Sequence, residues 1–203
     1  MKKQFCTIIF FIIILLSSSV QGQNTIEWDG KYQLQLSDFQ SLATQIGEVN
    51  IYSLQTASSF DFSFYMNSIE FMSTKNFNSK VNCSFTKDAA SLVAPDTLIA
   101  LDLLEFSRYE FDLSELYARK FRKKIFENKK GFSGVSFFQP FYDEIQKEYV
   151  VKRTLAAQLT DLGRNREILS ELHNEVLKEI QALADFCKIC NPKKKRNNIN
   201  YSK

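Results

Sequence analysis

The sequence predicts an α+β fold in which an antiparallel β-sheet from the N-terminal half packs on a central helix and a long C-terminal helix. Residues 44–86 contain runs in which apolar and polar side chains alternate, the period of half-buried strands. Residues 98–124 and 141–189 instead repeat apolar side chains every three or four positions, the period of helices. Strand-type and helix-type patterns thus occupy separate parts of the chain, which indicates the α+β class.

Short alternating runs mark the expected strands, at residues 26–28, 49–53, 60–66, 69–73 and 81–85. The aromatic side chains in these runs, and Trp28, are expected to fill the core; an exposed peptide-binding edge strand is the alternative. Asn and Ser residues at positions 76–79 predict a turn. Residues 88–96 read as a connector, and its last residues, Pro95 and Asp96, are typical of a helix start.

The central helix is predicted to have two apolar faces. The main face lies within about 80° of Phe106 at helical spacing, and a second stripe opposite it contains Leu101, Leu104 and Phe111. A helix that is apolar on two sides is covered on two sides, so the first half should cross the middle of the domain. Beyond Glu115 the outer side carries charged residues, namely Arg119, Arg122 and Lys123. We therefore expect the second half to reach the surface, and Glu115 and Arg119 to form an ordinary exposed pair. The other residues of the main apolar face are Leu98, Ile99, Leu103, Tyr109, Leu113, Leu116, Tyr117 and Phe121.

Residues 141–189 predict either one long helix or two consecutive helices. Leucine, valine and isoleucine keep a three-four spacing through this region. Gly163, followed by Arg164, Asn165 and Arg166, marks a kink or break, because glycine in a helix interior costs about 1 kcal/mol. His173 lies beside the apolar stripe and is expected at a seam or on the surface.

The N-terminus resembles a secretory signal peptide over residues 1–22. Lys2 and Lys3 precede an apolar run at 5–16, and a small, polar segment follows at 17–22. The apolar run is too short to span a bilayer comfortably, so we expect cleavage and no stable membrane insertion afterwards. The predicted location is therefore exported, either periplasmic or secreted, with a single domain at 23–190.

Residues 191–203 form a basic tail that is expected to be disordered. Four consecutive cations at 193–196 follow Pro192. The alternative is weak attachment of this tail to an anionic surface. Net charge is +3, and removing Lys2 and Lys3 leaves +1, so the body of the protein does not indicate a nucleic-acid partner; the tail also lacks the aromatic platform that such binding uses.

Three cysteines remain after residue 22, and a disulfide is the favoured interpretation in an oxidising compartment. Cys187 and Cys190 have CxxC spacing, but a redox pair normally opens a helix and this one follows a helix. A structural zinc would need two further ligands, and Cys83 and His173 are the only candidates of the usual type. The pairing stays open between Cys187–Cys190 and a bridge from Cys83 to either of them.

Residues 111–123, FDLSELYARKFRK, carry a family resemblance. They resemble the end of the long active-site helix of exported bacterial proteins that are classed as a domain of unknown function and described as zinc-dependent proteases. That helix reads His-Glu-Gln-x-His-Phe-Asp-Ile-x-Glu-Leu-x-Ala-Arg-Lys. The resemblance implies a zincin-like fold. In the alignment, Phe106 and Glu110 take the places of the two histidines, and Ser107 takes the place of the catalytic glutamate.

The two metal-binding histidines and the catalytic glutamate of that motif are therefore absent from this chain. A zincin helix holds the metal with two histidines four residues apart and activates a water with the adjacent glutamate. Phe106 has no ligand atom, Ser107 is no general base at neutral pH, and His173 is the single histidine of the sequence. A His-rich zinc site cannot be assembled from these residues, so we predict no metal cofactor and no catalytic residues.

The sequence favours an exported, non-catalytic relative of metalloproteases with a binding or structural role towards a protein, a peptide or an envelope component. Glu110 projects onto the main apolar face near Tyr109 and Tyr117, so it is expected to be a buried carboxylate that is paired or neutral. The first alternative is a hydrolase that uses other residues, such as Glu110 with Asp102. The second is association with anionic surfaces through the basic tail.

Overall fold

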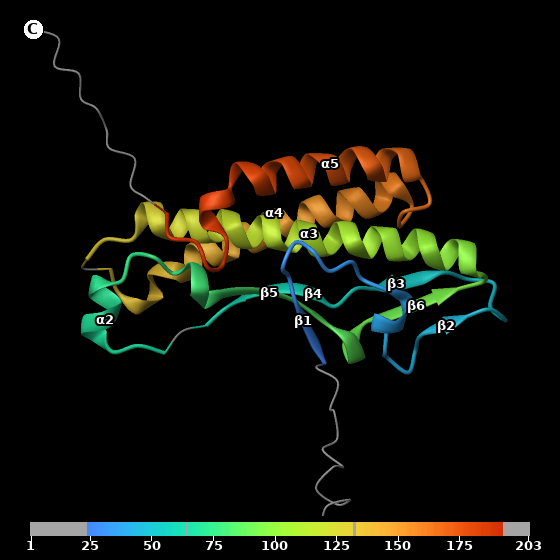
Figure 1. Ribbon diagram of the computed structural model, residues 1–203, viewed down its shortest axis with the longest axis horizontal. Coiled ribbons are helices and arrows are strands. Elements are labelled where there is room, and N and C mark those ends of the chain that lie inside the picture. Colours follow the sequence, from blue (N-terminus) through green and yellow to red (C-terminus); the bar gives the residue numbers. More distant parts are fainter. Residues whose placement is uncertain (1–23, 64, 132, 193–203) are drawn as a thin grey trace, which may run out of the picture.

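A computed structural model describes residues 24–63, 65–131 and 133–192, and it has a mixed α+β architecture, as the sequence predicts. The predicted signal peptide at 1–22 and the tail beyond Pro192 lie outside the described residues. Three long helices, α3, α4 and α5, lie on one side, and the strands lie on the other (Figure 1). The short 3-10 turns are η1 (Leu36–Asp38), η2 (Asn78–Lys80), η3 (Lys87–Ala89), η4 (Val135–Phe138) and η5 (Ala184–Phe186).

The first sheet is antiparallel, as predicted, with the order β1-β5-β4. It contains β1 (Thr25–Glu27), β4 (Ser58–Phe62) and β5 (Val81–Thr86). In this register Ile26 pairs with Phe85, and Phe60 pairs with Cys83. Val81, Cys83 and Phe85 are all buried, so the alternation in β5 corresponds to one face turned into the core.

The second sheet was not foreseen, because it is mixed and the sequence predicted neither its strand at 45–46 nor its strand at 91–94. Its order is β2-β6-β3, with β2 (Gln45–Ile46), β3 (Ser53–Gln55) and β6 (Ser91–Ala94). Strand β2 runs parallel to β6, and β3 runs antiparallel to it. Strand β6 occupies the expected connector at 88–96, where Leu92 and Ala94 are buried. Four residues are too few for a clear alternation, so this strand depends on pairing with its neighbours.

The strand expected at residues 69–73 is wrong, since this segment forms helix α2 (Ser68–Ser73). The Asn67 side chain accepts a hydrogen bond from the Glu70 backbone N–H at 2.9 Å and caps the helix. Phe71 packs inward, whereas Ile69 and Met72 are exposed. Two apolar residues separated by one polar residue fit a strand and a short helix equally well, and here the cap decides.

Helix α3 (Thr97–Asn128) is the predicted central helix. The Asp96 side chain accepts from the Ile99 N–H at 2.9 Å, which fixes its first turn. The helix packs on β4, β5 and β6 on one side and on α4 and α5 on the other. From Asp102 onward the apolar positions of the first half are covered on both sides, as its two apolar faces predict, whereas Leu98 and Leu101 in its first turns are exposed.

The second half of α3 is buried too, which corrects the expectation that it surfaces. Glu115, Arg119 and Arg122 are all buried, and the exposed fraction of Arg122 is only 1%. Residues of α5 and η5 cover these side chains and accept hydrogen bonds from the two arginines. A charged sequence position predicts exposure only when nothing later in the chain supplies partners for the charge.

The C-terminal region consists of two helices, α4 (Gln139–Thr160) and α5 (Arg166–Ala182). Gly163 lies at the break, with φ +100°, and Asn165 caps α5. A Cβ atom at Gly163 would lie 2.2 Å from the carbonyl oxygen of Asp102, so the turn passes directly against α3. Within the described ranges, no helix has both the length and the apolar composition needed to cross a bilayer.

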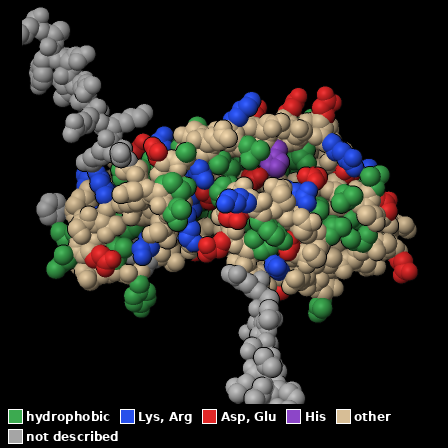
Figure 2. Space-filling model, viewed as in Figure 1, with side chains coloured by type: hydrophobic (Ala, Val, Ile, Leu, Met, Phe, Trp, Pro, Cys, Tyr) green, Lys and Arg blue, Asp and Glu red, His purple; other side chains and the backbone are tan. Residues whose placement is uncertain are grey.

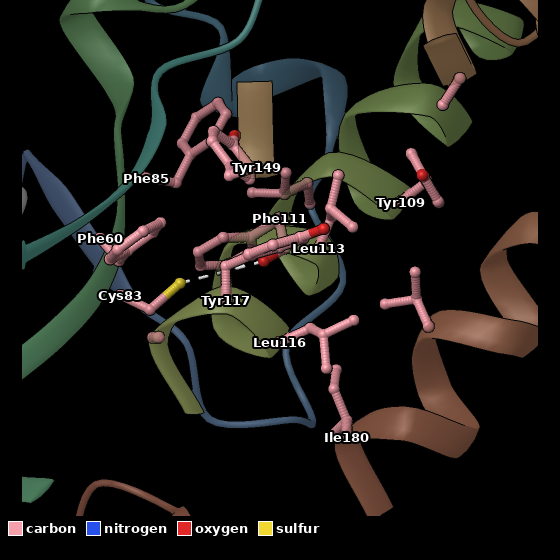
Figure 3. Packing of buried hydrophobic residues seen from close by; sticks show 14 of the residues in the cluster. Phe60, Cys83, Phe85, Tyr109, Phe111, Leu113, Leu116, Tyr117, Tyr149 and Ile180 are labelled. Carbon is pink, nitrogen blue, oxygen red and sulfur yellow. Dashed lines mark hydrogen bonds between the residues drawn. The ribbon is translucent and has the colours of Figure 1, made fainter. Parts of the chain in front are cut away.

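Aromatic side chains from both layers meet in the core. Figure 3 shows Phe60 and Phe85 of the sheet facing Phe111 and Tyr117 of α3, with Tyr149 of α4 alongside. Phe60 and Tyr149 pack edge to face with their ring centroids 5.8 Å apart. Phe60 and Phe85 are thus core residues, as expected, whereas Tyr65 is fully exposed and Phe64 lies outside the described residues.

Candidate functional site

Glu110 of α3 is the polar centre of the aligned motif, and three side chains contact it. Its Oε1 accepts hydrogen bonds from the Thr56 hydroxyl, from Arg153 Nε at 2.7 Å and from the Tyr149 hydroxyl at 3.4 Å. Its Oε2 has no partner among the residues that the structure describes. The exposed fraction of Glu110 is 2%, so this is the buried and paired carboxylate that the sequence predicts.

Burial raises the pKa of Glu110 above its ordinary value, because the ionised form loses its hydration. Arg153, Thr56 and Tyr149 all favour the ionised form and partly oppose this rise. Burial, and then the nearby Glu110 charge, likewise raise the pKa of Tyr149. The carboxyl group therefore keeps its proton to a higher pH than an exposed glutamate does.

A cavity of about 260 Å³ lies beside Glu110, between α3 and α4. Apolar side chains form most of its wall, and Arg153 and Gln158 contribute polar groups; the lining consists of Leu54, Phe106, Glu110, Arg153, Thr154, Ala157, Gln158 and Leu162. Phe106 and Glu110, which align with the two histidines of the zinc motif, thus line one cavity. Ser107 does not line the cavity. It lies in the core, where its hydroxyl donates a hydrogen bond to the Leu103 carbonyl at 2.9 Å.

The residues at this position do not fit a zinc ion. Phe106 offers no ligand atom, and the one bonded oxygen of Glu110 is already shared by an arginine and two hydroxyl groups. In the described part of the chain, no group of three His, Cys, Asp or Glu side chains is arranged to hold a metal. The geometry of the aligned positions is therefore that of an arginine-neutralised carboxylate.

Asp102, the other carboxylate considered for acid–base chemistry, does not join Glu110. Its Oδ1 accepts from Arg166 Nε at 2.6 Å, an ion pair that ties the start of α5 to α3. Asp102 is not among the residues that line the cavity. The two carboxylates therefore do not form the acid–base pair that a carboxylate mechanism requires.

His173 lies at the seam between α5 and α3, as expected, and its partner is Asp112. Asp112 Oδ2 lies 2.7 Å from His173 Nε2, and its Oδ1 accepts from Trp28 Nε1 at 2.6 Å. Tyr109 packs edge-on against the imidazole, with centroids 5.9 Å apart. The Asp112 carboxylate on α3 thus links Trp28, which follows β1, to His173 on α5. The cluster holds these three segments together.

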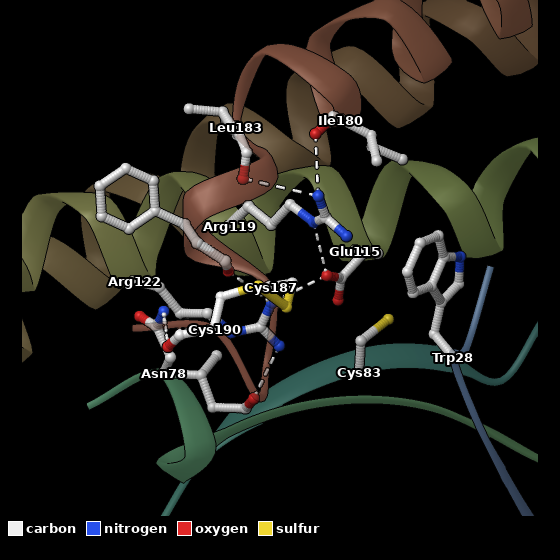
Figure 4. Close-up of polar contacts among 12 residues, drawn as sticks. Trp28, Asn78, Cys83, Glu115, Arg119, Arg122, Ile180, Leu183, Cys187 and Cys190 are labelled. Atoms are coloured by element: carbon white, nitrogen blue, oxygen red, sulfur yellow. Dashed lines mark hydrogen bonds and ion pairs between the residues drawn. A yellow bond between two sulfur atoms is a disulfide. The ribbon is translucent and has the colours of Figure 1, made fainter. Parts of the chain in front are cut away.

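A second polar cluster fixes the C-terminal segment onto α3 (Figure 4). Glu115 Oε1 accepts from Arg119 Nε and from Arg122 Nη1, both at 2.8 Å. Other donors reach backbone carbonyls: Arg119 Nη1 donates to Ile180 at 2.9 Å, and Arg122 Nη2 donates to Val81 at 2.8 Å. Arg122 Nε has no partner among the described residues. The sequence predicted an ordinary exposed Glu115–Arg119 pair, whereas the structure shows a buried cluster that also includes Arg122.

The disulfide joins Cys187 and Cys190, which decides between the pairings that the sequence left open. Cys83 is buried with a free thiol, and its Sγ lies 3.9 Å from the Phe111 carbonyl oxygen. Burial raises the pKa of this thiol well above its ordinary value, which makes it unreactive.

The sequence did not identify Thr56, Tyr149 or Arg153 as partners of Glu110. One signal was present, since Tyr149 and Arg153 are four residues apart and share a face of α4. Nothing local connects that face with Glu110, which lies about forty positions earlier in the chain. The partnership arises only when α4 packs on α3.

Stability should fall as pH rises across the titration of Glu110. The folded protein retains this proton at pH values where the unfolded chain has released it, because burial raises the folded-state pKa. The free energy of unfolding therefore decreases between the ordinary carboxyl pKa and the raised one. Urea unfolding of the wild type and Glu110→Gln at several pH values measures this, and the variant should show a flatter profile. A difference between the two proteins that does not vary with pH would contradict the raised pKa.

Comparison of the chain with protein-family models, with curated proteins and with solved structures finds no match. The interpretation of this site therefore rests on its geometry and on the helix motif at residues 111–123.

Proposed function

We propose that this is an exported, non-catalytic binding protein that retains a zincin-like scaffold and uses the α3–α4 cavity as its ligand site. One observation carries the proposal: Phe106 and Glu110, at the positions of the two zinc-binding histidines, line one cavity. In a zinc peptidase these positions face the substrate cleft, so a cavity there is what a scaffold without its metal would leave. The signal-like residues 1–22 support export.

The contacts of Arg153 favour an acidic ligand. Its Nε is bonded to Glu110, and among the described residues no other acceptor engages its guanidinium. Its side chain is about 40% exposed, so the free N–H groups can meet a carboxylate at the cavity mouth. The apolar wall formed by Leu54, Phe106 and Leu162 suits a hydrocarbon or aromatic body.

The size of the cavity limits the ligand. At about 260 Å³ it lies just below the range of roughly 300–1,000 Å³ that is typical of small-molecule sites. A small aromatic carboxylate fits this volume, as does the carboxyl-terminal residue of a peptide. The proposed partner is therefore a peptide end or a comparable envelope component with a free carboxylate.

Catalysis by other residues has less support. A serine hydrolase needs a base beside the nucleophile, whereas the Ser107 hydroxyl is bonded to the Leu103 carbonyl. A two-carboxylate mechanism needs Asp102 next to Glu110, whereas Asp102 is paired with Arg166. Both groups serve contacts within the fold.

Binding of 3-phenylpropionate should test the site, with 2-phenylethylamine as the oppositely charged probe. We expect chemical-shift changes in NMR spectra of the exported protein on adding 3-phenylpropionate, with a dissociation constant on the order of 1 mM for so small a ligand. Ala157→Leu fills the cavity without altering the Glu110–Arg153 pair and should abolish the effect. Ala182→Leu, at an exposed position on α5, is the matched control and should bind as the wild type does.

Three results would contradict the proposal. The first is the absence of shifts with 3-phenylpropionate, and the second is equal binding of the amine, which would show that Arg153 does not select the ligand. The third is one equivalent of zinc in the purified protein by elemental analysis, because the aligned residues would then hold the metal after all.

A further inference from the structure

Helix α2 carries an exposed apolar face at one end of the molecule. Phe71 points inward and packs on Phe77, with ring centroids 5.9 Å apart. The opposite side carries Ile69 and Met72, with exposed fractions of 80% and 45%, and Tyr65 just before the helix is fully exposed. Large apolar side chains that protrude together from a surface mark an interaction site.

Basic residues border one side of this apolar face. A hollow of about 300 Å³ lies between Met72 and the end of α3, and Lys75, Lys129 and Lys130 line it. Lys129 is buried over the Phe71 ring, with its Nζ 4.5 Å from the centroid, while Lys130 is exposed. Glu70 is the one acidic residue of α2. At the end of the molecule where α2 lies, Figure 2 shows apolar side chains together with both basic and acidic ones.

The last described residues, 190–192, lie at the same end of the molecule. Asn76 and Asn78 donate side-chain hydrogen bonds to the Cys190 carbonyl, at 3.0 and 3.1 Å. Residues 190–192 are therefore held beside the segment that follows α2, and the sequence continues with four cations at 193–196. The last described residue before the polybasic run thus lies close to the apolar helix face, although the two are far apart in the sequence.

We propose that the α2 end of this protein docks on an anionic lipid surface. Apolar side chains that enter the headgroup region, together with nearby cations that attract acidic lipids, are the two components of peripheral membrane binding. A nucleic acid would use the cations but not Ile69 and Met72.

Charge distinguishes this end from the opposite one. Leu42, Ile46 and Ile51 are exposed near β2 and β3, at the far end of the molecule from α2 in Figure 1. Residues 40–58 contain no Lys or Arg. Arg164 lies over the Tyr52 ring at that end, but it is paired with Asp161 at 2.7 Å. An anionic bilayer should therefore select the α2 end.

Co-sedimentation with vesicles tests the proposal, using exported protein whose mass confirms that residues 1–22 are gone. The wild type should bind phosphatidylglycerol vesicles in a salt-sensitive manner and bind phosphatidylcholine vesicles far less. Ile69→Asp should weaken binding about tenfold or more, because it removes an apolar side chain that would enter the headgroup region and adds a negative charge. Deleting residues 193–203 should also weaken binding. Leu42→Asp is the matched control and should bind like the wild type, and thermal unfolding checks that each variant is folded.

Several outcomes would overturn the proposal. Equal binding of Ile69→Asp and the wild type would assign the interaction to charge alone and remove α2 from it. An equal loss in Leu42→Asp would show that exposed apolar residues act without regard to position. Absence of binding to phosphatidylglycerol would exclude the lipid surface altogether. None of these results depends on the cavity beside Glu110.

Discussion

Replacing Glu115 by alanine should lower the free energy of unfolding by about 3–5 kcal/mol. This carboxylate is buried and neutralises two buried arginines, Arg119 and Arg122, through one oxygen atom. Removing it leaves two positive charges in the core with backbone carbonyls as their remaining partners. Urea unfolding followed by circular dichroism measures the loss, and the C-terminal segment should become the first part to exchange amide hydrogens.

Two further variants make this prediction specific. Glu127→Ala removes a half-exposed glutamate of the same helix, whose nearest cation is Lys123 at 3.9 Å, and should change stability by less than about 0.5 kcal/mol. A triple variant that replaces Glu115, Arg119 and Arg122 by apolar residues should be more stable than Glu115→Ala alone, because no unpaired charge remains buried. Equal stability of Glu115→Ala and Glu127→Ala would show that the cluster contributes nothing to folding.

Gly163→Ala is the second change with a large expected effect, a loss of roughly 3 kcal/mol or more. The φ angle of +100° is unfavourable for any residue with a Cβ atom. The added carbon would also lie 2.2 Å from the Asp102 carbonyl oxygen, which is backbone and cannot rotate away. The turn between α4 and α5 would have to move off α3, and thermal unfolding should show a lower midpoint.

Two other glycines separate the causes of this loss. Gly47 has φ +92° but open space around the position of its Cβ, so Gly47→Ala should cost about 1 kcal/mol from backbone conformation alone. Gly131 has neither a positive φ nor a close neighbour, and Gly131→Ala should be nearly neutral. If Gly163→Ala costs no more than Gly47→Ala, the close approach to Asp102 does not exist in solution.

Patterns between neighbouring residues predicted much of the fold. The apolar spacing at 98–124 and the start at Asp96 predicted α3, and the alternation at 81–85 predicted β5. These features act over a few residues, through side-chain period and helix capping. The same reasoning failed at 69–73, where a short run fits both periods, and at β6, where four residues are stabilised by strands on either side.

The sequence predicted one member of the Glu110–Arg153 pair but not the other. The sequence placed Glu110 on a buried face of α3 and required a partner for its charge. Arg153, which supplies that partner, lies 43 residues away on a different helix. No local pattern relates the two positions, because a pairing of this kind depends on how two helices pack.

The sequence by itself determined that α3 is helical, that the helical pattern is interrupted at Gly163 by a kink or a break, and that the turns which align with a zinc motif lack the side chains to bind zinc. These are properties of composition and local spacing. Only the tertiary structure decided that Glu115, Arg119 and Arg122 are buried, that Cys187 pairs with Cys190, and that Cys190 lies beside the segment that follows α2. A charged side chain can be buried when distant backbone carbonyls and an opposite charge satisfy it, and folding alone brings those partners within hydrogen-bonding distance.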